Sequence, residues 1–157
     1  MSIDRVKNYF KQFGMTERVL ELAESSATVE LAAQALHCEP ERIAKTLSFR
    51  SGESVLLVVA AGDAKIDNRK YKEFFGEKAK MLGFDEVEPL VGHAVGGVCP
   101  FGINTGIPVY MDVSLKRFTT VFPACGSANS AIELTIPELE NYAKCQEWVD
   151  VCKGWQE

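Results

Sequence analysis

Histidine is scarce in this chain: His37 and His93 are the only two among 157 residues. The five cysteines contain no CxxC pair. Zinc sites need Cys and His ligands at short, regular spacings, so the sequence predicts no metal site and no metal cofactor. A nucleophile elbow of the GxSxG type, which marks one class of serine hydrolases, is also missing.

Long apolar runs are absent as well. The longest strongly apolar run, residues 55–61, is far too short to span a bilayer. The N-terminal residues read as a charged amphipathic helix rather than a signal peptide. An odd number of irregularly spaced cysteines suits free thiols in a reducing compartment. We therefore expect a cytoplasmic protein that has no membrane contact.

The chain also lacks an excess of basic residues. The chain has 17 Lys and Arg against 22 Asp and Glu, giving a net charge of −5. Strong non-specific binding of nucleic acid rests on phosphate neutralisation, so the balance argues against it. One segment is locally basic, through Lys65, Arg69, Lys70, Lys72, Lys78 and Lys80. This segment is either a solvated helix face or a weak, local contact with nucleic acid.

Periodicity and turn residues indicate a single α/β domain over residues 1–157, rich in strands at its centre. Residues 55–60 are apolar without alternation, which predicts a central strand covered on both faces. The expected strands are 19–22, 45–50, 54–61, 79–82, 108–113, 118–125 and 131–135. The expected helices are 2–13, one opened by Thr28, 40–44, one from Asp67 to Phe75, one capped by Asp85, and 136–144. The tail after Cys145 is expected to dock on the body through Trp148 and Trp155.

The most informative loop runs from Val95 to Gly102. Glycine lets a backbone approach a ligand closely, and successive amides then hold an anion or a developing oxyanion. A tight structural turn explains the same glycines equally well. The loop matches neither GxxxxGK[ST] nor GxGxxG, which disfavours nucleotide phosphate binding of those kinds.

Other candidates are ambiguous when they are taken alone. Lys45 stands where a short helix gives way to a strand; such a lysine either donates to a carbonyl or phosphate or is simply solvated. Asp63 and Lys65 follow the central strand and are equally ambiguous, and residues 126–129 (Gly-Ser-Ala-Asn) form either a hairpin turn or the rim of a site. Cys99 with His93 suggests a thiol nucleophile, although a small packing residue is the simpler interpretation.

Taken together, these pieces resemble the YbaK/EbsC family, which includes the editing insertion domain of bacterial prolyl-tRNA synthetase. Landmarks occur in the family's order across nearly the whole chain: the lysine in residues 43–47 (Ile-Ala-Lys-Thr-Leu), the strand and turn 58–67, the loop 96–102, and residues 126–133 leading into the last helix. The resemblance implies one domain with a mixed, barrel-like central sheet flanked by helices. It also implies that the protein hydrolyses mischarged aminoacyl-tRNA without a metal or another cofactor. The expected substrate is chiefly tRNA(Pro) that carries cysteine or another small amino acid.

Roles follow from the resemblance. Lys45, Gly96 and Gly97 are expected to be catalytic. The lysine is expected to bind the substrate carbonyl or a phosphate, and the loop amides are expected to hold the developing oxyanion. The expected substrate-binding residues are Thr46, Asp63, Lys65, Val98, Cys99, Pro100, Phe101, Gly102, Gly126, Ser127, Ala128 and Asn129. Some alanine-specific relatives carry an asparagine after the lysine and a histidine near the last strands. Thr46 and residues 126–129 depart from that pattern, which argues against alanine specificity.

The expected partner is the aminoacylated 3′ end of tRNA. The acidic net charge predicts weak affinity for tRNA alone, which makes a prolyl-tRNA synthetase a second candidate partner. Two other functions stay open: a non-catalytic module that binds tRNA or a synthetase, and a hydrolase that depends on Cys99.

Overall fold

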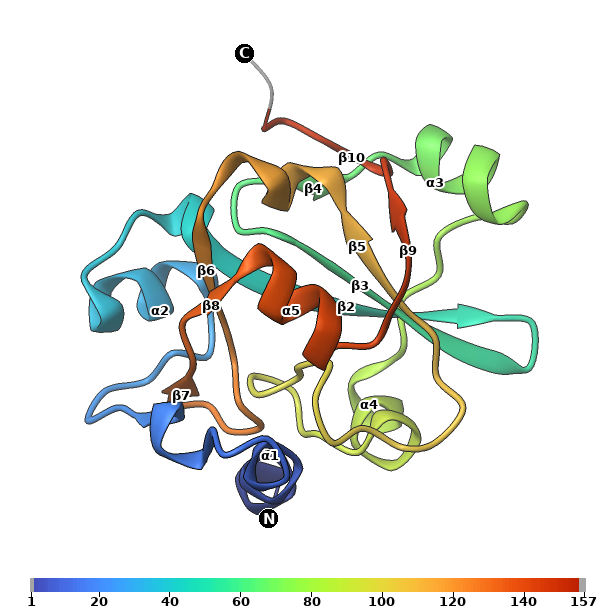
Figure 1. The fold of residues 1–157 in the computed structure, drawn as a ribbon. Helices are drawn as coiled ribbons and strands as arrows, with labels where there is room; N and C mark the ends of the chain where they lie inside the picture. The colour runs from blue at the N-terminus through green and yellow to red at the C-terminus, as the bar shows by residue number, and fades with distance from the viewer. Residues whose placement is uncertain (1, 156–157) are drawn as a thin grey trace.

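The structure, a computed structural model, describes residues 2–155 and shows a single α/β domain. A curled, mixed sheet of six strands forms its centre in the order β8-β6-β2-β3-β5-β9 (Figure 1). These strands are β2 (Ile43–Ser51), β3 (Ser54–Ala61), β5 (Val109–Asp112), β6 (Thr120–Pro123), β8 (Leu134–Thr135) and β9 (Cys145–Val149). Two small pairs flank the sheet: β1 (Leu20–Glu21) with β7 (Ser130–Ala131), and β4 (Lys65–Ile66) with β10 (Cys152–Lys153). The predicted mixed sheet is thus confirmed.

Five α-helices surround the sheet within the described residues: α1 (Ser2–Lys11), α2 (Val29–Leu36), α3 (Asn68–Phe75), α4 (Phe84–Val91) and α5 (Ile136–Tyr142). Three short 3-10 helices, η1 (Thr16–Arg18), η2 (Pro40–Arg42) and η3 (Val113–Arg117), complete the elements. Figure 1 shows α1 and α4 at one end of the domain and α3 near β10 at the other.

Strands β2 and β3 form an antiparallel hairpin that pairs Lys45 with Ala60. β5 pairs in parallel with the other side of β3, and β6 pairs in parallel with the other side of β2. Every residue of β3 after Ser54 is buried. A strand that is covered on both faces needs no polar alternation, so the prediction of a central apolar strand is confirmed.

Local capping signals explain where several helices begin. The Thr28 hydroxyl accepts a hydrogen bond from the Leu31 amide, and Asp67 accepts from the amides of Arg69 and Lys70, as N-cap residues do. The prediction that Asp85 caps the next helix is wrong. Helix α4 begins one residue earlier, at Phe84, because Gly83 donates its amide to the Glu86 side chain and accepts the Glu86 amide.

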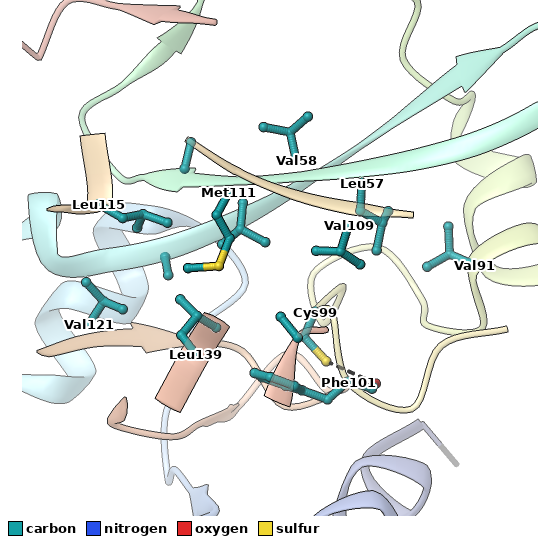
Figure 2. Close-up of a cluster of buried hydrophobic side chains, with 14 of the residues drawn as sticks. Leu57, Val58, Val91, Cys99, Phe101, Val109, Met111, Leu115, Val121 and Leu139 are labelled. Carbon is teal, nitrogen blue, oxygen red and sulfur yellow. Dashed lines mark hydrogen bonds between the residues drawn. The ribbon is translucent and has the colours of Figure 1, made fainter. Parts of the chain in front are cut away.

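The core lies between the sheet and the helices that cover it. Met111, Leu115, Val121 and Leu139 pack together there (Figure 2). Residues 79–82 form one isolated bridge, from Met81 to Phe49, rather than the expected strand. The expected strand 131–135 is divided into β7 and β8, and the tail supplies β9, which pairs in parallel with β5.

Candidate functional site

A cavity of about 390 Å³ lies where α2 and α4 approach strands β2 and β6. Its walls are largely aliphatic, with side chains such as Val29, Leu36, Ile43 and Leu82. Lys45 is the only charged residue among the described residues that line it. An apolar cavity of this size with a few convergent polar groups is the ordinary form of a small-ligand site.

Lys45 lies on strand β2 and lines this cavity. The half-buried side chain donates from Nζ to the carbonyl oxygen of Gly62, 3.4 Å away. A Cβ on Gly62 would lie 2.0 Å from the Pro40 carbonyl oxygen, so only glycine allows the end of β3 to approach η2 so closely. The acceptor beside Lys45 is therefore held by close backbone packing.

Burial lowers the pKa of the Lys45 ammonium from its ordinary value. The positive charge of Lys65 acts in the same direction, whereas the carboxylates of Asp63 and Glu30 oppose it. A desolvated ammonium interacts with a neighbouring partial negative charge more strongly than a solvated one does. Lys45 is thus placed to stabilise a carbonyl or phosphate oxygen that enters the cavity.

The glycine loop forms one wall of the cavity, and the turn at residues 126–129 packs against this loop outside the lining. The Gly97 carbonyl accepts from the Gly126 amide at 3.0 Å, and the Ala128 carbonyl accepts from the Ser26 amide at 2.6 Å. A Cβ on Gly97 would lie 2.5 Å from the Ser127 nitrogen. The wall therefore depends on glycine at position 97, and Gly96 and Val98 beside it line the cavity.

The amides of this wall differ in availability. The Gly97 N–H donates to the Ala94 carbonyl at 3.0 Å and is already used. The Gly96 and Val98 amides donate to no acceptor in the described part of the chain. These two amides, on residues that line the cavity, are available donors for a negatively charged oxygen.

Thr46 adds an unusual hydroxyl. Its Oγ1 is buried and has no hydrogen-bond partner within residues 2–155, and the residue lines the cavity. An unpaired buried hydroxyl is costly unless a ligand or water completes it. Thr46 is therefore a candidate ligand contact next to Lys45.

Several expected site residues lie elsewhere. Cys99 and Phe101 are fully buried in the core near Val109 and Leu139 (Figure 2). The Cys99 thiol lies 3.5 Å from His93 Nε2, and burial raises its pKa to about 12. A neutral, enclosed thiol is a poor nucleophile. We therefore leave both residues out of the proposed site and set aside the hydrolase that depends on Cys99.

The remaining candidates lie outside the cavity lining. Asp63 forms a two-pronged ion pair with Arg117 at 2.6 and 3.0 Å, and Lys65 is exposed on β4. Pro100 is buried, and Gly102 packs on the Arg5 backbone. Gly126, Ser127, Ala128 and Asn129 do not line the cavity either; Asn129 joins them to Leu22 by a hydrogen bond of 3.0 Å.

The sequence did not single out the residues that α2 and α4 contribute. Val29, Ala32 and Leu36 formed an apolar stripe that is typical of a core-facing helix, yet they line the cavity. Met81 and Phe84 also line it, although both are exposed. The one signal available for Phe84 is a strongly apolar residue directly before two acidic residues, Asp85 and Glu86.

Residues 23–142 match the family described as the aminoacyl-tRNA editing domain. The chain belongs to this family. Every residue that lines the cavity lies within the matched span. The fold and the family thus agree with the resemblance found in the sequence.

Individual relatives support the same assignment. The uncharacterized protein YwhH of Bacillus subtilis is 55% identical over 157 residues, which cover 99% of this chain and 100% of that protein. A proline–tRNA ligase of Bacillus cytotoxicus is 24% identical over 124 residues, covering 78% of this chain but only 22% of the ligase. A crystal structure described as a candidate trans-editing enzyme for prolyl tRNA synthetase is 31% identical, with a TM-score of 0.87 and 98% of both chains covered.

Two further features are missing from residues 2–155. No group of three or more His, Cys, Asp and Glu side chains is arranged to hold a metal ion. Over the same residues, no helix has both the length and the apolar character that a membrane crossing needs.

Proposed function

We propose that this chain is an aminoacyl-tRNA deacylase that hydrolyses the ester between a small amino acid and mischarged tRNA(Pro). The single observation that carries the proposal is the shared cavity of Lys45 and the available Gly96 and Val98 amides. Membership of the editing-domain family and the similarity to proline–tRNA ligases support the same substrate class.

The arrangement suits hydrolysis of an ester, which is already an activated bond. In this mechanism the Lys45 ammonium and the loop amides stabilise the negative charge that develops on the carbonyl oxygen. No imidazole, carboxylate or thiol occurs among the described lining residues. Water attacks the carbonyl carbon, the bond from that carbon to the tRNA oxygen breaks, and the free amino acid leaves. When the amino acid is cysteine, its own thiol can attack instead, and the product is a thiolactone. In either case the proton of the attacking group passes, directly or through solvent, to the departing tRNA oxygen.

The cavity walls favour small, weakly polar side chains on the substrate. Aliphatic residues discriminate by size, and one methylene in an apolar pocket changes binding by only about 1–3 kcal/mol. Thr46 in place of asparagine, and residues 126–129 without a histidine, favour cysteine or another small amino acid over alanine.

The proposed partner is the 3′ end of tRNA, with a prolyl-tRNA synthetase as a second candidate. Exposed Lys65, Arg69, Lys72, Lys78 and Lys80 form a basic segment from β4 to the residue before Met81 that suits phosphate contact, although Arg69 is paired with Glu73. The net charge of −5 limits the affinity of the chain for free tRNA. If a synthetase is a partner, adding prolyl-tRNA synthetase should raise the affinity for tRNA at physiological salt. An affinity that stays unchanged would count against the synthetase as a partner.

A deacylation panel tests the function. Cysteinyl, alanyl, seryl, threonyl and 2-aminobutyryl esters of tRNA(Pro) are incubated with the purified protein, and release of the amino acid is followed. We expect fast release of at least one small amino acid, with cysteine ahead of alanine. Tight tRNA binding without release from any ester would instead support a non-catalytic binding module.

A further inference from the structure

Phe84 is the most exposed large apolar side chain of the described residues, with 78% of its surface open to solvent. It nevertheless lines the cavity that holds Lys45. Met81 and Val95, which are 59% and 48% exposed, line the same cavity. These three residues, here called the apolar rim, form a concentrated apolar surface, and such surfaces commonly mark binding sites.

The apolar rim is held by ordered structure. Phe84 is the first residue of α4, whose Gly83 amide donates to Glu86 Oε1 at 2.8 Å, and Glu86 also pairs with Arg50 on β2. The Leu82 amide donates to the Ser48 carbonyl at 3.2 Å, which fixes the residue between Met81 and Gly83 to β2. The backbone that carries Phe84 is therefore fixed, which lowers the entropic cost of binding.

The charged residues around Phe84 indicate which kind of group binds on its ring. Exposed Asp85 and Glu88 follow it on α4 and would repel a phosphate placed on the ring. Exposed Lys78 and Lys80 lie just before Met81, where they suit a phosphodiester. A neutral, flat group joined to a phosphate chain fits both features, and a nucleobase of single-stranded nucleic acid is such a group.

We propose that the apolar rim stacks the terminal nucleobase of the tRNA acceptor end, while the aminoacyl ester enters the cavity toward Lys45. This inference rests on the proposed function for the identity of the nucleic acid. It makes Phe84 a positioning residue that binds the substrate away from the reacting atoms.

The test uses two readouts on the full chain. The first is KM and kcat for a mischarged tRNA(Pro), measured with the wild type, Phe84→Ala, Phe84→Trp and Leu90→Ala. Leu90 is the matched control, because it is an exposed apolar residue on the same helix that does not line the cavity. The second is the fluorescence of uncharged tRNA(Pro) that carries 2-aminopurine as its terminal base, which stacking quenches.

We expect Phe84→Ala to raise KM by roughly 5- to 150-fold with little change in kcat, and to lose the quenching. Phe84→Trp should restore both, and Leu90→Ala should alter neither. Equal KM and equal quenching in Phe84→Ala and the wild type would overturn the inference, even if hydrolysis itself is established. A wild-type dimer that Phe84→Ala dissociates would also overturn it, since a second copy would then cover the rim. If the wild type hydrolyses no ester, the proposed function fails, and the quenching still decides whether Phe84 stacks a base.

Discussion

The Gly97 carbonyl accepts a hydrogen bond from the Gly126 amide, 3.0 Å away, and joins two loops that are far apart in the sequence. A Cβ on Gly97 would lie 2.6 Å from the Gly126 carbonyl carbon. Close backbone contact of this kind leaves no room for a side chain. It fixes the wall that carries Gly96 and Val98.

Gly97→Ala is therefore expected to lower the free energy of unfolding by about 1–3 kcal/mol, because the added methyl group overpacks the contact. Hydrolysis should fall as well, since Gly96 and Val98 move with the wall. Thermal unfolding and deacylation rates measure the two effects. Gly83→Ala is the control, because its Cβ would meet nothing nearer than the Glu86 side chain at 3.4 Å. A Gly97→Ala protein as stable and active as Gly83→Ala would contradict this role.

Cys99→Ala is expected to keep hydrolysis close to the wild-type rate while losing about 1 kcal/mol of stability through the vacated volume. Burial keeps this thiol neutral, with a pKa of about 12. In native buffer, iodoacetamide should label the half-buried Cys38 and Cys145 before Cys99, as mass mapping would show. Complete loss of activity in a folded Cys99→Ala protein would restore the thiol-nucleophile hypothesis.

His93 predicts a dependence of stability on pH. Burial lowers the pKa of this imidazole, although its hydrogen bond to the Phe101 carbonyl, at 2.6 Å, opposes the shift. Because the unfolded chain takes up a proton more readily than the folded one, stability is full above about pH 6.5 and falls as the pH drops below it. Urea unfolding at pH 7.5 and 5.5 measures the loss. His93→Gln should show a smaller loss between the two pH values; an equal loss would assign it to other groups.

Much of the fold could be predicted because its signals are local. Thr28 and Asp67 cap their helices through their own side chains, and the run from Val55 to Ala60 marks a buried central strand. Strand β9 could not be predicted in the same way. It is short, partly polar and paired on one side only, so its position comes from contact with β5 rather than from its own pattern.

The site was predictable only in part. Residues alone left Lys45 and the glycine loop uncertain, and the resemblance placed them in one expected site. The salt bridge between Asp63 and Arg117, 54 positions apart in the chain, leaves no trace in the local sequence. The apolar stripe of Val29, Ala32 and Leu36 on α2 predicts a core-facing helix, because a cavity wall and a core face have the same apolar spacing.

Hydrolysis of cysteinyl-tRNA(Pro) by Lys45→Ala tests the central claim most directly. Single-turnover rates are compared with those of the wild type and of Lys11→Ala, which removes an exposed lysine on α1, outside the cavity lining and outside the basic segment. Circular dichroism and tRNA binding establish that each variant folds and binds. We predict that Lys45→Ala is slower by roughly 100- to 1,000-fold, the usual cost of losing one donor to an oxyanion, and that Lys11→Ala is unchanged. A folded Lys45→Ala protein that hydrolyses the ester at the wild-type rate would contradict the account.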